Sequence, residues 1–128
     1  MSMSYNYITI IGYNLTDFAT EKYQDWQWTD VWEDYTYYQS VGQIQIFDNG
    51  ASYDETIYFG YIVSNNEVYD YSIEELELEK INDIVGSVKQ ELFKLIDTGV
   101  INEDAKYLTP KIISFVYISW GKTWIKQF

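Results

Sequence analysis

The sequence predicts an α+β domain in which an antiparallel sheet of about four to six strands packs against one long helix, at about residues 82–98. Three observations support this fold class. Short segments rich in isoleucine, valine and tyrosine recur between turn-forming residues. A single longer segment has apolar residues at helical spacing. The 128 residues contain no internal repeat or low-complexity linker, so we expect a single domain spanning residues 1–128.

The first half of the chain supplies most of the predicted sheet. Tyr5–Tyr13 has the composition of a buried strand. Val41–Phe47 alternates between isoleucine and glutamine, and Thr56–Val63 follows after a turn-rich segment, which together predict an antiparallel hairpin. Asn65-Asn66 is a second turn signal, since asparagine tolerates positive φ. We therefore expect Glu67–Tyr71 to form a third strand of the same meander.

The second half supplies the helix and another strand. A capping-box pattern opens the helical candidate at Ser72–Glu75, but the following residues alternate like a strand, so residues 72–81 stay open between helix and strand. Asn82–Thr98 is the segment we predict to be helical, and Gly99 is its C-terminal stop. Lys111–Trp120 is strongly apolar and predicts a strand, and Thr123–Phe128 a shorter one. The apolar face of the helix consists of Ile81, Ile84, Val85, Val88, Leu92, Leu95 and Ile96.

The composition removes most catalytic and metal-binding chemistry. The chain contains no cysteine, histidine or arginine. Disulfides, thiolate nucleophiles, zinc–thiolate sites and histidine-dependent triads are therefore impossible. We expect a protein that is not an enzyme and that holds no cofactor and no metal. No stretch approaches the roughly 20 apolar residues of a membrane helix, and the N-terminus lacks a secretory signal, so we expect no membrane association and a cytoplasmic location.

Charge is distributed very unevenly along the chain. The first 79 residues carry fifteen carboxylates against Lys22, whereas residues 80–128 carry five carboxylates against seven lysines. The net charge of −12 repels nucleic acid, so direct binding to DNA or RNA is not expected. It favours long-range attraction to a basic protein. The N-terminal part is therefore the predicted working surface, and the C-terminal part its scaffold.

The segment Asp25–Tyr38 interleaves three tryptophans and three tyrosines with four acids. This is more aromatic surface than one small core easily buries, so some of these side chains are expected to form a binding surface. The alternative is that Trp26, Val31, Trp32 and Tyr35 plug the sheet while the acids are merely solvated. A second acidic cluster extends from Asp48 to Glu79. The predicted partner-binding residues are Asp25, Trp28, Asp30, Glu33, Asp34, Tyr37, Asp54, Glu55, Glu74, Glu75 and Glu77.

The acidic half of the chain, with the interleaved segment Asp25–Asp34, resembles in composition the small phage-encoded inhibitors of bacterial defence, the anti-restriction and anti-CRISPR proteins. The resemblance implies a non-catalytic inhibitor that occupies a basic, nucleic-acid-binding surface of a partner protein. Two alternatives stay open. One is an assembly module that oligomerises through exposed aromatics. The other is a carbohydrate- or ligand-binding domain that uses Trp26, Trp28 and Trp32 as a platform. The sequence does not decide the oligomeric state.

Overall fold

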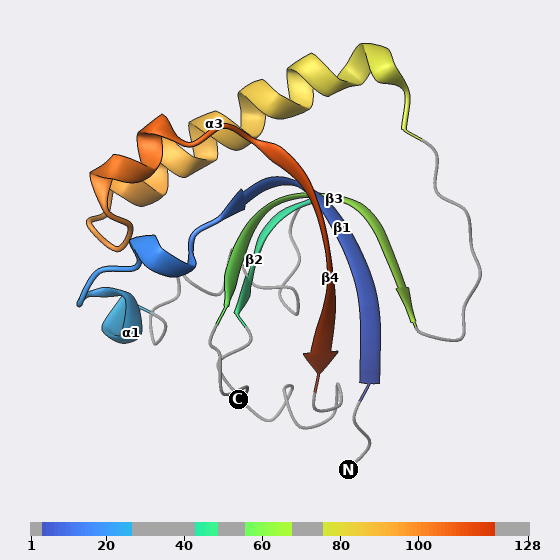
Figure 1. Cartoon of the computed structure of the whole chain (residues 1–128). Coiled ribbons are helices and arrows are strands. Elements are labelled where there is room, and N and C mark those ends of the chain that lie inside the picture. Colours follow the sequence, from blue (N-terminus) through green and yellow to red (C-terminus); the bar gives the residue numbers. More distant parts are fainter. Residues whose placement is uncertain (1–3, 27–42, 49–55, 68–75, 120–128) are drawn as a thin grey trace.

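A computed structural model describes residues 4–26, 43–48, 56–67 and 76–119. Four antiparallel strands form one sheet in the order β2-β3-β1-β4 (Figure 1). A helix, α3 (Ile81–Asp97), follows a short 3-10 turn and lies across one face of this sheet. The predicted α+β class is therefore confirmed. The strands are β1 (Ser4–Asn14), β2 (Ile44–Asp48), β3 (Ile57–Glu67) and β4 (Lys111–Ser119), and the shorter elements are η1 (Thr16–Phe18), α1 (Tyr23–Trp26), η3 (Leu78–Lys80) and η4 (Glu103–Tyr107).

The long helix is amphipathic, and its apolar face covers the sheet. Its buried residues, Ile84, Val88, Leu92 and Leu95, recur at intervals of three or four and form one core with residues of β1, β2 and β3. Burial in this core raises the pKa of the Tyr13 phenol above its ordinary value, because the charged form would lose hydration.

The helix ends where the sequence predicts. Gly99 adopts a φ of 83°, and its N–H donates to the carbonyl of Ile96 at 3.0 Å. The predictions of a helix at about 82–98 and of a stop at Gly99 are thus confirmed.

The opposite face of the sheet is also apolar, and the sheet curls around it. Phe47 of β2 lies 5.3 Å from Phe115 and 5.4 Å from Tyr117 of β4, measured between ring centroids, although β2 and β4 are the two outer strands. Three strand spacings in a flat sheet would separate those strands by roughly 14 Å. Tyr58 of β3 stacks on Phe115 at 4.3 Å. The face that carries α3 is therefore convex, and the aromatic face is concave (Figure 1).

Two glycines face each other where β1 pairs with β3. Gly12 of β1 and Gly60 of β3 are direct cross-strand partners. A Cβ atom on Gly12 would come within 2.0 Å of the Phe59 carbonyl oxygen, and one on Gly60 within 2.4 Å of the Ile11 carbonyl oxygen. Only glycine fits this close approach of two main chains.

The predicted strands are mostly confirmed. Tyr5–Tyr13, Thr56–Val63 and Lys111–Trp120 correspond to β1, β3 and β4, and β2 and β3 form the predicted antiparallel hairpin. Isoleucine and glutamine alternate between the two faces of β2 as predicted. Gln45 is nevertheless buried, because both faces of the sheet carry apolar side chains. The predicted strand Thr123–Phe128 and the capping box at Ser72 fall outside the described residues.

The predicted turn at Asn65-Asn66 is wrong. β3 continues through both asparagines to Glu67 and pairs with β1 over that length. A bulge at Val63 shifts the register between Thr9 and Ile10. The side-chain amide of Asn6 donates to the Asn65 side-chain oxygen at 2.9 Å, so this asparagine is used for cross-strand pairing and not for a turn. The predicted third strand, Glu67–Tyr71, begins at the last residue of β3, and its other residues fall outside the described part of the chain.

Candidate protein-binding surface

Two segments far apart in the sequence lie side by side beyond the end of the sheet. Ala19 and Ile101 form an isolated antiparallel bridge. The Thr20 N–H donates to the Val100 carbonyl at 2.9 Å, and the Asn102 N–H donates to the Phe18 carbonyl at 2.7 Å. The Thr20 hydroxyl also donates to the Gly99 carbonyl at 2.6 Å. The chain leaving α3 is thus fastened to the chain that follows β1.

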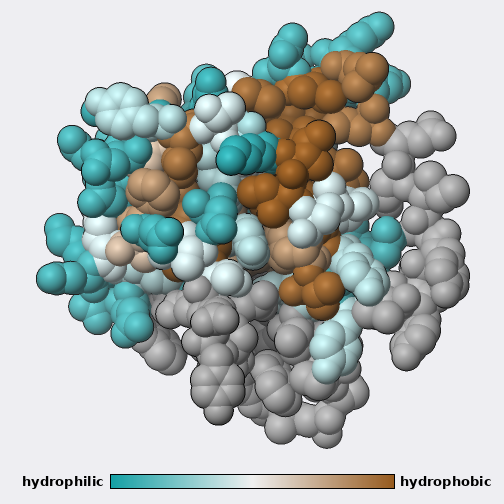
Figure 2. Space-filling model, in the orientation of Figure 1, coloured by the Kyte–Doolittle hydropathy of each residue, from teal (hydrophilic) through white to brown (hydrophobic). Residues whose placement is uncertain are grey.

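This fastening gathers six exposed carboxylates, which we call the acidic end. They are Asp17, Glu21, Asp25, Asp97, Glu103 and Asp104. Lys22 and Lys106 are the lysines in the same two segments. Within the described part of the chain, no ion pair involves any of the six carboxylates. Figure 2 shows hydrophilic residues gathered on the left, over α1 and the C-terminal end of α3.

The acidic end rests on a well-packed base. Tyr23 and Trp26 of α1 are buried in the core beneath α3, and their rings lie 5.8 Å apart. The Tyr23 hydroxyl donates to the Asp48 carboxylate at 3.0 Å, which ties α1 to β2. On the other segment, the Asn102 side chain caps η4 by accepting from the Asp104 N–H at 2.9 Å. The carboxylates are therefore presented on fixed main chain.

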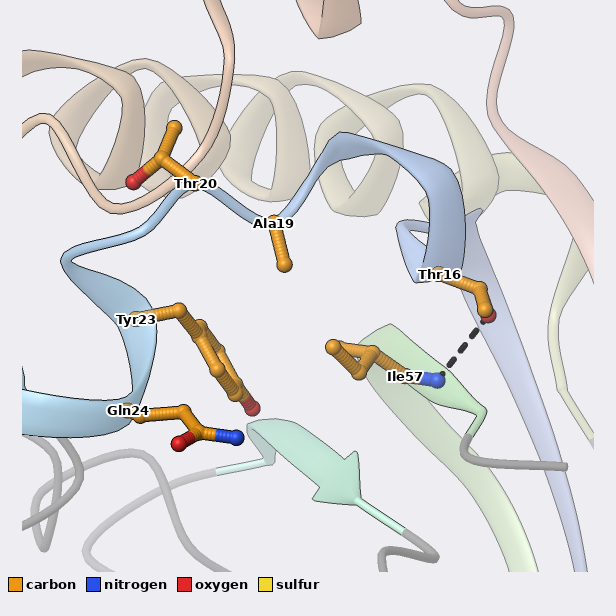
Figure 3. Close-up of a pocket in the computed structure, with 6 residues that line it drawn as sticks. All are labelled: Thr16, Ala19, Thr20, Tyr23, Gln24 and Ile57. Carbon is orange, nitrogen blue, oxygen red and sulfur yellow. Dashed lines mark hydrogen bonds between the residues drawn. The ribbon is translucent and has the colours of Figure 1, made fainter. Parts of the chain in front are cut away.

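A shallow pocket of about 160 Å³ opens beside α1 (Figure 3). The hydroxyl groups that line this pocket form hydrogen bonds within the protein. The Thr16 hydroxyl oxygen accepts from the Ile57 N–H at 3.0 Å, and Thr20 and Tyr23 donate to Gly99 and Asp48 as described above. Asp17, Glu21 and Asp25 each directly follow a lining residue in the sequence. The pocket walls are Thr16, Ala19, Thr20, Tyr23, Gln24 and Ile57.

Of the eleven predicted partner-binding residues, Asp25 and Glu77 lie within the described part of the chain. Asp25 belongs to the acidic end. Glu77 precedes α3 at the opposite end of that helix, with its carboxylate 3.7 Å from the Lys80 ammonium. A helix of seventeen residues is about 25 Å long, so the structure does not bring these two predicted residues together. The others, Trp28, Asp30, Glu33, Asp34, Tyr37, Asp54, Glu55, Glu74 and Glu75, fall outside the described residues.

The predicted division of the chain into an acidic N-terminal working surface and a C-terminal scaffold does not match the three-dimensional arrangement of the carboxylates. Asp97, Glu103 and Asp104 come from the near-neutral part of the chain but join the acidic end. The exposure of Asp97 follows from the helical pattern, which places this residue off the apolar face of α3. The neighbourhood of the three carboxylates with residues 17–25 depends on a contact across more than 70 positions, which no local pattern contains.

Trp26 is buried, at 8% exposure, as in the interpretation that assigned it to the core. It is therefore not an open surface on which a sugar ring could stack. The other residues of these two hypotheses fall outside the described residues. They are Trp28 and Trp32 of the proposed sugar-binding platform, and Val31, Trp32 and Tyr35 of the face proposed to pack against the sheet.

Comparison of the chain with protein-family models, with curated proteins and with solved structures found no match. Within the described ranges, no helix is long and apolar enough to cross a membrane. The same residues contain no group of three or more potential ligands placed to hold a metal ion.

Proposed function

We propose that this protein is a non-catalytic acidic binding protein that occupies a basic surface of a partner protein. The observation that carries the proposal is the fastening of residues 17–25 to residues 97–104, which places six exposed carboxylates at one end of the fold. The net charge of −12 steers such a surface toward a cationic partner over a Debye length of roughly 10 Å.

The partner class follows from the same chemistry. A cationic surface large enough to engage several carboxylates is most often one that binds nucleic acid, because phosphate backbones require clustered lysine and arginine. An inhibitor of a host nucleic-acid-binding factor, carried by a phage or mobile element and working in the host cytoplasm, is the function that fits. The pocket beside Asp17, Glu21 and Asp25 suits the aliphatic part of a basic side chain, whose charge would remain near these carboxylates.

Affinity capture tests the proposal. The immobilised protein is exposed to a bacterial lysate at low salt, retained proteins are eluted with a salt gradient, and the main one is purified and titrated. We expect affinity to fall steeply as salt rises, and duplex DNA to compete for the partner. An affinity that is the same at low and high salt would contradict the proposal.

Two matched double variants separate local charge from net charge. The first reverses Glu21 and Asp25 to lysine, and the second reverses Glu79 and Asp83 at the other end of α3. Both change the net charge equally and alter only exposed side chains. We expect the first to weaken partner binding by at least tenfold more than the second. Equal losses would show that net charge, and not the acidic end, drives association.

The second candidate function is an assembly module. It is supported by a different observation, the exposed apolar side chains on the adjacent strands β1 and β4.

A further inference from the structure

The convex face of the sheet carries exposed apolar side chains that α3 does not cover. Tyr5 and Tyr7 of β1 are 42% and 54% exposed, and Ile112 and Val116 of β4 are 73% and 41% exposed. Tyr7 and Val116 are cross-strand partners, so the four side chains follow two adjacent strands on one face. We call them the exposed strip. Figure 2 shows hydrophobic residues gathered near the centre of the view, where β4 begins.

The strip borders a long strand edge. β4 comprises nine residues and pairs with β1 on one side, and no described strand pairs with its other side. After Lys111 the strand contains no charged residue and no proline. Exposed edges are usually protected from pairing by such residues or by bulges, and β4 lacks them from Ile112 onward.

The residues of β4 are complementary to a second copy of themselves. Ile112 and Val116 lie two positions before and two positions after Ser114 on the same face. If two β4 strands pair antiparallel about a two-fold axis at Ser114, each Ile112 lies opposite the Val116 of the other copy. Side chains directly opposite in an antiparallel pair interact most strongly, so both exposed residues gain an apolar neighbour.

We propose that two copies of this chain associate through β4, with Ser114 opposite Ser114, to form a continuous sheet of eight described strands. The arrangement uses a strand in which Lys111 is the one charged residue. The acidic end of each copy takes no part in this pairing, because its carboxylates lie on the segments 17–25 and 97–104 and not on β4. The two-fold axis closes the assembly at a dimer, since the pairing uses the same edge of both copies.

The charge of the chain sets the salt dependence of this dimer. Two copies of net charge −12 repel each other, and added salt screens that repulsion. Dimerisation should therefore strengthen with salt, whereas binding to a basic partner should weaken. The failure of one proposal is thus distinguishable from the failure of the other.

Sedimentation velocity and single-cysteine cross-linking test the proposal. We expect a species of about 30 kDa, twice the chain mass of 15.2 kDa, to increase with protein concentration and with salt. Because the chain has no cysteine, a Ser114→Cys variant carries one thiol per copy. The proposed register places the two Cα atoms about 4.5–5.5 Å apart, within disulfide range. Val116→Cys is the matched control, since its counterparts would lie about 13 Å apart along the strand.

Rapid oxidation of the Ser114→Cys variant to a disulfide dimer, with slow oxidation of the Val116→Cys variant, would support the register. Equal oxidation rates for both variants, or a monomer at every protein and salt concentration, would overturn the proposal. A monomer would indicate that the strip binds a different protein and not a second copy. Val116→Lys should abolish the dimer, whereas Leu78→Lys, at an 81% exposed apolar site outside the strip, should not. Circular dichroism establishes that each variant is folded, and an intact dimer in the Val116→Lys variant would also contradict the proposal.

Discussion

The acidic end and the exposed strip lie at different places in the fold and use opposite chemistry. The acidic end consists of charged side chains on two segments that are fastened by three hydrogen bonds. The strip consists of uncharged side chains on two long strands. A charged surface attracts a partner from a distance, and salt weakens that attraction. An apolar surface binds its partner only at contact, and salt does not weaken this binding. The comparison indicates two binding surfaces on one small fold, which mutations can separate.

Phe47→Ala should have the largest effect and should act mainly on the β4 side. The Phe47 ring is buried and contacts rings of β4 across the concave face, so its removal leaves a cavity between the two outer strands. We expect a loss of about 3–5 kcal/mol in the free energy of unfolding, measured by urea denaturation. Phe93→Ala, at a half-exposed site on α3, is the control and should cost less than about 1 kcal/mol.

Hydrogen exchange locates the damage in the Phe47→Ala variant. Amides of β4 should lose more protection than those of residues 18–20 and 99–102, since the acidic end does not depend on this ring. A uniform loss in both regions would show that the two surfaces are not independent of each other.

Gly12→Ala should have the next largest effect, because it acts where the main chains of β1 and β3 approach each other closely. The added Cβ would overlap the Phe59 carbonyl oxygen, and the main chains of β1 and β3 would have to separate. We expect a loss of about 3 kcal/mol in the free energy of unfolding. The same substitution at Gly86 on α3, where a Cβ meets no atom within 4 Å, should instead stabilise by about 1 kcal/mol. Similar unfolding midpoints for the two variants would contradict the requirement for glycine at this close approach of β1 and β3.

The sequence predicts the local elements of this fold better than the contacts between them. The period of apolar residues in 81–96 is a local property, so α3 and its stop at Gly99 are recovered within one or two residues. The Asn65-Asn66 signal fails because a tertiary partner, Asn6, is 59 positions away and no local pattern contains it. The same holds for the candidate site. The composition indicates an acidic surface, but the contribution of Asp97, Glu103 and Asp104 depends on the bridge between Ala19 and Ile101.

Thr20→Val should have the smallest effect and should be confined to the acidic end. Valine keeps the branched shape of threonine but removes the hydroxyl that donates to the Gly99 carbonyl, one of the contacts that fasten residues 17–25 to residues 97–104. We expect a loss of about 1 kcal/mol in the free energy of unfolding, the typical net value of one hydrogen bond. Thr109→Val, at an exposed site, is the control and should change it by less than about 0.5 kcal/mol. Because the main-chain bonds between the two segments remain, the acidic end should loosen without dispersing, and dimerisation through β4 should be unchanged. A Thr20→Val variant as stable as the Thr109→Val control would mean that these main-chain bonds alone hold the acidic end together.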